Sequence, residues 1–270
     1  MGWIPASWYN SSMHPFFFKG TPFETPSWDV VLLIGFIIVL LIGLILKPKD
    51  FPVTRLGIIA FALISLFVGS LGGKLLYVFI HRETLFNVMH LSFGNAFISS
   101  GYAFLGTLGF VLIAMAVFAK LRPRPVSFLA CADFGLPLII LHQAFTRIGC
   151  FMAGCCYGPV TGLPWGCYFA GETLKRHPTQ IYFAISLLVI FFYALYLLKK
   201  NLPKGVVFFT ALFTYGLSRC ILESWRVDSP HILGPVTLAQ AVTFTLAAVS
   251  GVCLYVILAR NGLIISRRKL

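Results

Sequence analysis

Charged residues are scarce in this sequence. They make up 11% of its 270 residues, and only eight of them are acidic, whereas a soluble domain carries about 25% charged residues. Hydrophobic residues account for 59% of the chain. This composition excludes a sizeable soluble domain, and we expect residues 1–270 to form a single integral membrane domain.

Several other patterns are missing. The net charge of +13 is spread over short clusters without a continuous basic stripe, which argues against nucleic-acid binding. The seven cysteines include no Cys-x-x-Cys pair, so a zinc or thioredoxin-like site is weakly supported and small apolar filler is the simpler interpretation. No metal and no cofactor are predicted. No basic region precedes the first apolar run, so we expect no cleavable signal peptide.

Long apolar runs dominate what is present. A helix needs about 20 apolar residues to cross a bilayer, and seven runs approach or exceed that length. The sequence therefore predicts an all-α polytopic membrane protein with seven transmembrane helices, at residues 30–46, 56–80, 97–119, 126–146, 181–198, 205–225 and 236–259.

The basic residues between these runs predict an orientation, because lysine and arginine concentrate in cytoplasmic loops. One set of loops holds thirteen of them: Lys47, Lys49, Arg55, Lys120, Arg122, Arg124, Lys199, Lys200, Lys204, Arg260, Arg267, Arg268 and Lys269. The other set holds six: Lys19, Arg82, Arg147, Lys175, Arg176 and Arg226. We therefore expect the N-terminus outside and the C-terminus in the cytoplasm.

Residues 147–180 are expected on the outer side, yet they are not polar. Aromatic and aliphatic side chains alternate there with glycines, which permit turns and close backbone approach. Non-helical backbone at membrane depth is tolerated where it is buried in protein or lines a cavity. We therefore expect an interfacial or re-entrant segment that lines a cavity.

Arg147 and Arg219 are the strongest candidates for binding a ligand. The guanidinium fork pairs well with phosphate oxygens, and charged groups at membrane depth usually serve a function. The plainer interpretations are pairing of Arg219 with Glu223 one turn later and snorkelling of Arg147 to the interface. Other polar groups in or beside the spans have structural and functional interpretations open to them: Asp29, Lys74, Asp133, His142 and His177.

The order and spacing of several motifs resemble the prolipoprotein diacylglyceryl transferase family over nearly the whole chain. These motifs are Gly73-Lys-Leu-Leu-Tyr77, Arg147-Ile-Gly-Cys-Phe151, Gly154 to Gly158, His177-Pro-Thr-Gln-Ile-Tyr182, Tyr215 to Arg226 and Thr237-Leu-Ala-Gln240. The resemblance implies transfer of diacylglyceryl from phosphatidylglycerol to the lipobox cysteine thiol of a prolipoprotein. It also implies a multi-pass protein of the bacterial cytoplasmic membrane, with its active site toward the outer leaflet.

The resemblance assigns catalytic roles to Arg147, Arg219 and Glu223. It implies substrate-binding roles for Arg147, Gly149, Cys150, Gly154, Gly158, His177, Gln180, Tyr182 and Arg226. Some positions depart from the family pattern. Phe104 stands where the family has a histidine proposed as a base, Cys150 replaces an asparagine, and Phe183 replaces a glutamate.

Three alternatives remain open. The departures fit a divergent relative that binds or transfers another lipid, or that uses another acceptor. A membrane thiol-disulfide oxidoreductase could use Cys150, Cys155 and Cys156, and it would need a redox-active pair with a thiol of low pKa. A small-solute transporter would show internal repeats, and none is evident in the sequence.

Overall fold

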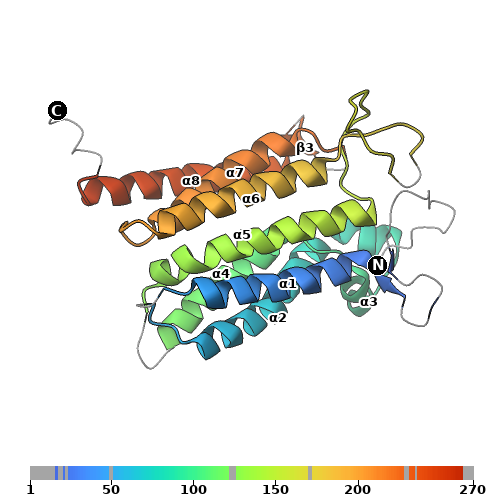
Figure 1. Cartoon of the computed structure of the whole chain (residues 1–270). Coiled ribbons are helices and arrows are strands. Elements are labelled where there is room, and N and C mark those ends of the chain that lie inside the picture. Colours follow the sequence, from blue (N-terminus) through green and yellow to red (C-terminus); the bar gives the residue numbers. More distant parts are fainter. Residues whose placement is uncertain are drawn as a thin grey trace. The chain divides into compact units, whose positions relative to one another are not determined.

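The computed structural model describes residues 16–17, 21, 24–48, 51–121, 126–169, 172–227, 231–234 and 236–263. Seven of the described helices are long and apolar enough to cross a membrane (Figure 1). They are α1 (Ser27–Leu46), α2 (Arg55–Ile80), α4 (Phe104–Leu121), α5 (Phe128–Ala153), α6 (Thr179–Leu198), α7 (Val206–Glu223) and α8 (Leu238–Arg260). The predicted all-α, seven-span architecture is confirmed, and the protein is a multi-pass membrane protein. Its orientation stays a prediction.

Two span boundaries differ from the sequence-based prediction by seven residues, and the others lie within three residues of it. The third span begins at Phe104 and not at residue 97, because Ser100 is extended and separates it from a short helix, α3 (Phe93–Ser99). A single π-helical segment, η2 (Glu83–Val88), precedes α3. The fourth span continues to Ala153, so Arg147 and Cys150 are helical. Apolar content alone could not reveal either boundary.

The chain forms two compact units, one within Ile42–Ala132 and the other comprising Ala6–Leu41 and Asp133–Leu270. The description of the chain as a single membrane domain stays a prediction. Strand is sparse among the described residues. Strand β1 (Phe16–Phe17) pairs with β2 (Thr25–Pro26), and β3 (His231–Leu233) pairs with β4 (Val236–Thr237), both antiparallel.

In the first unit, α2 packs closely against α4 (Figure 1). A Cβ added to Gly106 would lie 2.3 Å from the carbonyl oxygen of Gly72, so only glycine permits this approach, as is common between membrane helices. Lys74 projects from α2 and donates from Nζ to the carbonyl oxygens of Phe97 and Ile98, at 3.0 and 3.1 Å. The last turn of α3 therefore uses Lys74 as a C-terminal cap.

In the second unit, α7 packs against α6 and α8 (Figure 1). The buried carboxylate of Asp133 on α5 accepts hydrogen bonds from the backbone N–H groups of Gly205 and Phe208, at 2.6 and 2.7 Å. The first turn of a helix has no internal acceptors for these donors, so Asp133 caps α7 from a neighbouring helix. Its place in the fold gives Asp133 a structural role.

The described residues between α5 and α6, 154–169 and 172–178, are not helical. Isolated bridges join Arg176 to Val160 and to Cys167. Glu172 accepts a hydrogen bond from the Tyr157 hydroxyl at 2.8 Å and pairs with Arg176 at 2.8 Å. These contacts give the segment a defined structure. Its predicted place at the membrane interface, and the cavity that it was expected to line, stay predictions.

Candidate active site

Two arginines from different helices meet over one aromatic ring. The guanidinium carbon of Arg147 on α5 lies 4.7 Å from the ring centroid of Phe183 on α6, and that of Arg219 on α7 lies 4.6 Å from the same centroid. The two guanidinium groups are therefore no farther apart than the sum of these distances. A cation over a ring face is held by the ring's quadrupole and keeps its N–H donors for other partners.

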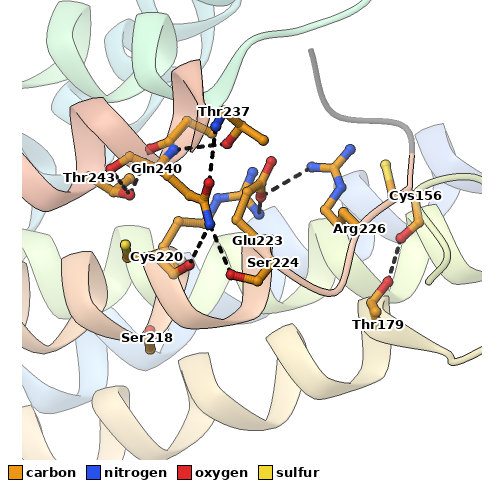
Figure 2. A network of polar contacts seen from close by, with 12 residues as sticks. Cys156, Thr179, Ser218, Cys220, Glu223, Ser224, Arg226, Thr237, Gln240 and Thr243 are labelled. Atoms are coloured by element: carbon orange, nitrogen blue, oxygen red, sulfur yellow. Dashed lines mark hydrogen bonds and ion pairs between the residues drawn. The ribbon is translucent and has the colours of Figure 1, made fainter. Parts of the chain in front are cut away.

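Glu223 anchors this pair from one helical turn beyond Arg219. Its Oε2 lies 2.8 Å from Nη1 of Arg219 and 3.7 Å from Nη1 of Arg226, and the side chain is only 2% exposed. Figure 2 shows Glu223 paired with Arg226, beside a link from Gln240 of α8 to the Ser224 hydroxyl at 2.9 Å. The predicted pairing of Arg219 with Glu223 is therefore present. The cluster of Arg147, Arg219, Arg226 and Glu223 keeps a net positive charge.

The cluster contains more cationic charge than its own carboxylate offsets. Arg147, Arg219 and Arg226 lie close enough to interact electrostatically, and Glu223 is the carboxylate that pairs with Arg219 and Arg226. Among the described residues, the buried Nε of Arg147 has no hydrogen-bond partner. Such a group costs free energy unless a ligand completes it. The arrangement is suited to an anion with several oxygen acceptors.

Gln180 lies on the same face of α6 as Phe183, because residues three apart on a helix are neighbours. Its side chain is fully buried, and its Nε2 donates to the carbonyl oxygen of Cys155. Its Oε1 has no partner within the part of the chain that the structure describes. Gln180 therefore connects the segment after α5 to α6 and keeps one buried acceptor that could take a hydrogen bond from a ligand.

His177 and Tyr182 form a separate hydrogen-bonded group. Nδ1 of His177 lies 3.0 Å from the Tyr182 hydroxyl, which also accepts the indole N–H of Trp165 at 3.0 Å. The His177 ring meets Trp225 edge-on at 5.1 Å between centroids. These contacts hold the start of α6 against the segment that follows α5. The substrate-binding roles predicted for His177 and Tyr182 stay predictions.

The three predicted glycines serve the backbone. A Cβ at Gly149 would come within 3.0 Å of Trp28 on α1, and one at Gly158 would meet Thr179 and the Trp225 carbonyl at 2.8 Å. Gly154 has φ of +73°, a left-handed conformation that ends α5. No contact of these glycines points to a ligand, and their predicted binding roles stay predictions.

The remaining polar candidates lie at the starts or inside of helices. Asp29 is in the first turn of α1. The ring of His142 meets Phe36 edge-on at 6.5 Å, and its buried Nε2 has no hydrogen-bond partner among the described residues. Phe104 begins α4 in the first unit. Phe183 was not predicted as a site residue from the sequence, although its departure from the family pattern was a signal.

The cysteine cluster consists of Cys150, Cys155 and Cys156. Their Sγ atoms all lie within 4.8 Å of one another. The sequence favoured apolar filler, and the absence of a Cys-x-x-Cys pair gave a zinc or thioredoxin-like site little support. In the structure the turn at Gly154 brings the three thiols together. Hydrogen bonds from Cys150 and Cys155, and then the charges of Arg226 and Arg147, lower the pKa of the Cys156 thiol.

Comparison with known proteins shows a match to the model of the prolipoprotein diacylglyceryl transferase family over residues 15–257. A phosphatidylglycerol–prolipoprotein diacylglyceryl transferase of Clostridium tetani is 32% identical over 67% of this chain and 73% of its own length. One of Geobacter sulfurreducens is 30% identical over 85% of this chain and 90% of its own length. One of Mannheimia succiniciproducens is 38% identical over 58% of each. The predicted resemblance to this family is confirmed.

Proposed function

Because the chain belongs to the prolipoprotein diacylglyceryl transferase family, we propose that it transfers the diacylglyceryl group of phosphatidylglycerol to a prolipoprotein cysteine. The acceptor is the lipobox cysteine that ends a signal peptide. The protein acts in the bacterial cytoplasmic membrane, with its site toward the outer leaflet, where translocated prolipoproteins arrive. The observation that carries the proposal is the meeting of Arg147 and Arg219 over Phe183.

In this reaction the phosphate of phosphatidylglycerol lies between the two guanidinium groups. The acceptor sulfur attacks the glyceryl carbon next to the phosphate ester and forms a C–S bond. The C–O bond breaks, and its electron pair stays on the phosphate oxygen of the departing glycerol phosphate. The phosphate becomes more negatively charged as it leaves. Preorganised hydrogen-bond donors that stabilise this negative charge contribute about 3–4 kcal/mol each.

Glu223 positions the donors. Its short ion pair fixes the orientation of Arg219 on α7, and its longer contact restrains Arg226. Phe183 also positions the two guanidinium groups, because its ring contacts both of them without accepting any of their N–H donors. A glutamate at this position would offset positive charge, whereas phenylalanine leaves the pair free to bind an anion.

The test is incubation of the purified full chain with a lipobox peptide in vesicles of phosphatidylglycerol. Mass spectrometry should show a gain of one diacylglyceryl unit, and a peptide with Cys→Ser at the lipobox should show none. Rescue of a strain depleted of its own transferase is the matching test in cells. No mass gain from a well-folded preparation, together with no rescue, would favour a divergent relative with another lipid or acceptor.

A further inference from the structure

Three thiols converge where α5 ends. The N–H of Cys155 donates to the carbonyl oxygen of Cys150 at 3.2 Å, and that of Gly154 donates to Phe151 at 3.1 Å. With Gly154 left-handed, this is the Schellman pattern of helix termination. It turns the chain back over the last helical turn. Cys155 is thereby stacked over Cys150, and Cys156 follows with its Sγ 3.8 Å from that of Cys155.

The backbone at Cys156 adopts a conformation that residues with a side chain rarely adopt. Cys156 has φ of +65°, which is uncommon for a residue with a Cβ. The Thr179 hydroxyl donates to the Cys156 carbonyl at 2.6 Å, and Gln180 donates to the carbonyl of Cys155. Figure 2 shows the Thr179 contact. Strained conformations persist where surrounding contacts enforce them, and they concentrate at functional sites. Two side chains of α6 thus fix where the thiols lie.

The spacing of the three sulfurs suits a shared metal ion. Thiolates bound to zinc at about 2.3 Å in a tetrahedral arrangement lie roughly 3.8 Å apart. The observed Cys155–Cys156 separation is 3.8 Å, and all three sulfurs are within 4.8 Å of one another. Among the described residues the group has three members. Three protein ligands with one open position is the pattern of catalytic zinc sites.

The surroundings also suit a thiolate site with access from outside. Arg147 and Arg226 lie close enough to Cys156 to stabilise negative charge there. Three thiolates and one zinc ion carry a net charge of about −1, which these cations offset. Cys155 is exposed, whereas Cys150 and Cys156 are partly buried. The open side of the cluster is therefore at Cys155, and the cluster shares Arg147 with the phosphate site.

Resting on the function proposed above, we infer that Cys150, Cys155 and Cys156 bind one zinc ion whose fourth coordination position takes the acceptor cysteine thiol. A coordinated thiol is deprotonated outright, and its proton passes to solvent at the exposed side. The sulfur then forms the C–S bond as the C–O bond to phosphate breaks. Zinc stays Zn(II), and no oxidant or reductant is consumed. This site supplies the thiolate although Phe104 stands where the family has a histidine.

Metal content tests the site without reference to activity. The full chain and the variants Cys150→Ser, Cys155→Ser and Cys156→Ser are purified in detergent, exposed to zinc and dialysed. Cys167→Ser is the matched control, since Cys167 lies in the same outer segment outside the cluster. We expect about one zinc per chain in the parent and control, and at least tenfold weaker binding in each cluster variant. Cobalt(II) should give thiolate charge-transfer absorption that the cluster variants lose.

Equal zinc content in all variants would overturn the site, as would a disulfide within the cluster in the purified protein or binding of copper(I) but not zinc. A second arm measures transfer to a lipobox peptide before and after chelation. Loss on chelation and recovery with zinc are expected. Transfer that survives complete metal removal would overturn the activating role and leave the proposed function standing. A zinc-loaded chain without any transfer would instead contradict the proposed function.

Discussion

Lys74 and Arg147 are both cations within transmembrane helices, but the protein uses them differently. Lys74 donates two hydrogen bonds to the carbonyl oxygens that end α3. Its Nζ also lies 5.4 Å from the ring centroid of Phe97 and 5.4 Å from that of Tyr102. Arg147 contacts a ring and keeps a buried donor without a partner among the described residues. A cation whose donors serve the protein holds the fold together, whereas one with donors to spare is suited to bind an anion.

The largest predicted loss of transfer distinguishes Arg147 from Lys74. Arg147→Ala or Arg219→Ala should lower transfer about 100- to 1,000-fold, because each removes a donor to the leaving phosphate. Lys74→Met should lower the melting temperature and change transfer per folded molecule by less than about threefold, since its hydrogen bonds are internal to the fold. Single-turnover transfer and thermal unfolding in detergent measure both. Comparable losses of transfer in all three variants would erase the distinction.

Replacing Phe183 should cause the next largest loss of transfer. Phe183→Leu removes the ring shared by both guanidinium groups, and two cation–π contacts of about 0.5–1 kcal/mol each predict a loss of transfer of about five- to thirtyfold. Phe191→Leu on the same helix is the control, because Phe191 is equally buried but contacts neither arginine in any cation–π pair described. Kinetics at varied phosphatidylglycerol concentration distinguish them. Equal kinetics in the two variants would remove Phe183 from the site.

Replacing Asp133 should lower the stability of the protein and leave the transfer reaction unchanged. Asp133→Ala removes the cap of α7 and leaves two backbone donors unpaired, at a cost of about 1–2 kcal/mol in the free energy of unfolding. Asp133→Asn keeps an acceptor oxygen and should recover part of the loss. Thermal unfolding tests the size of the effect. Transfer per folded molecule should stay near the parent value, and a selective loss of transfer would mean that the cap also shapes the site.

The smallest effect should come from Glu172, in the segment between α5 and α6. Burial alone raises the pKa of Glu172, but hydrogen bonds from Arg176 and Tyr157 outweigh it and lower the pKa below its ordinary value of 4.5. The stability from this carboxylate is therefore present above that pH and lost as pH falls through the lowered pKa. Glu172→Gln should cost about 1 kcal/mol or less at pH 7. The melting-temperature gap from the parent should close in acid, and a constant gap would exclude this origin.

The sequence predicted much of this organisation and missed what the turns create. Apolar length identified seven spans, helical spacing predicted the pairing of Arg219 with Glu223, and the family resemblance grouped both with Arg147. Periodicity could not show that α5 continues past Arg147 or that Gly154 folds Cys155 back over Cys150. The role of Phe183 was hidden for a similar reason, because a phenylalanine in an apolar helix looks the same whether it faces lipid or two arginines.

The central claim is that Arg147 and Arg219 together hold the phosphate of one phosphatidylglycerol molecule. Native mass spectrometry of the full chain should therefore detect retained phosphatidylglycerol, with retention sharply reduced in Arg147→Gln and Arg219→Gln and little further reduced in the double variant. Retention of neutral diacylglycerol should not change. Undiminished retention of phosphatidylglycerol in the double variant would contradict the account.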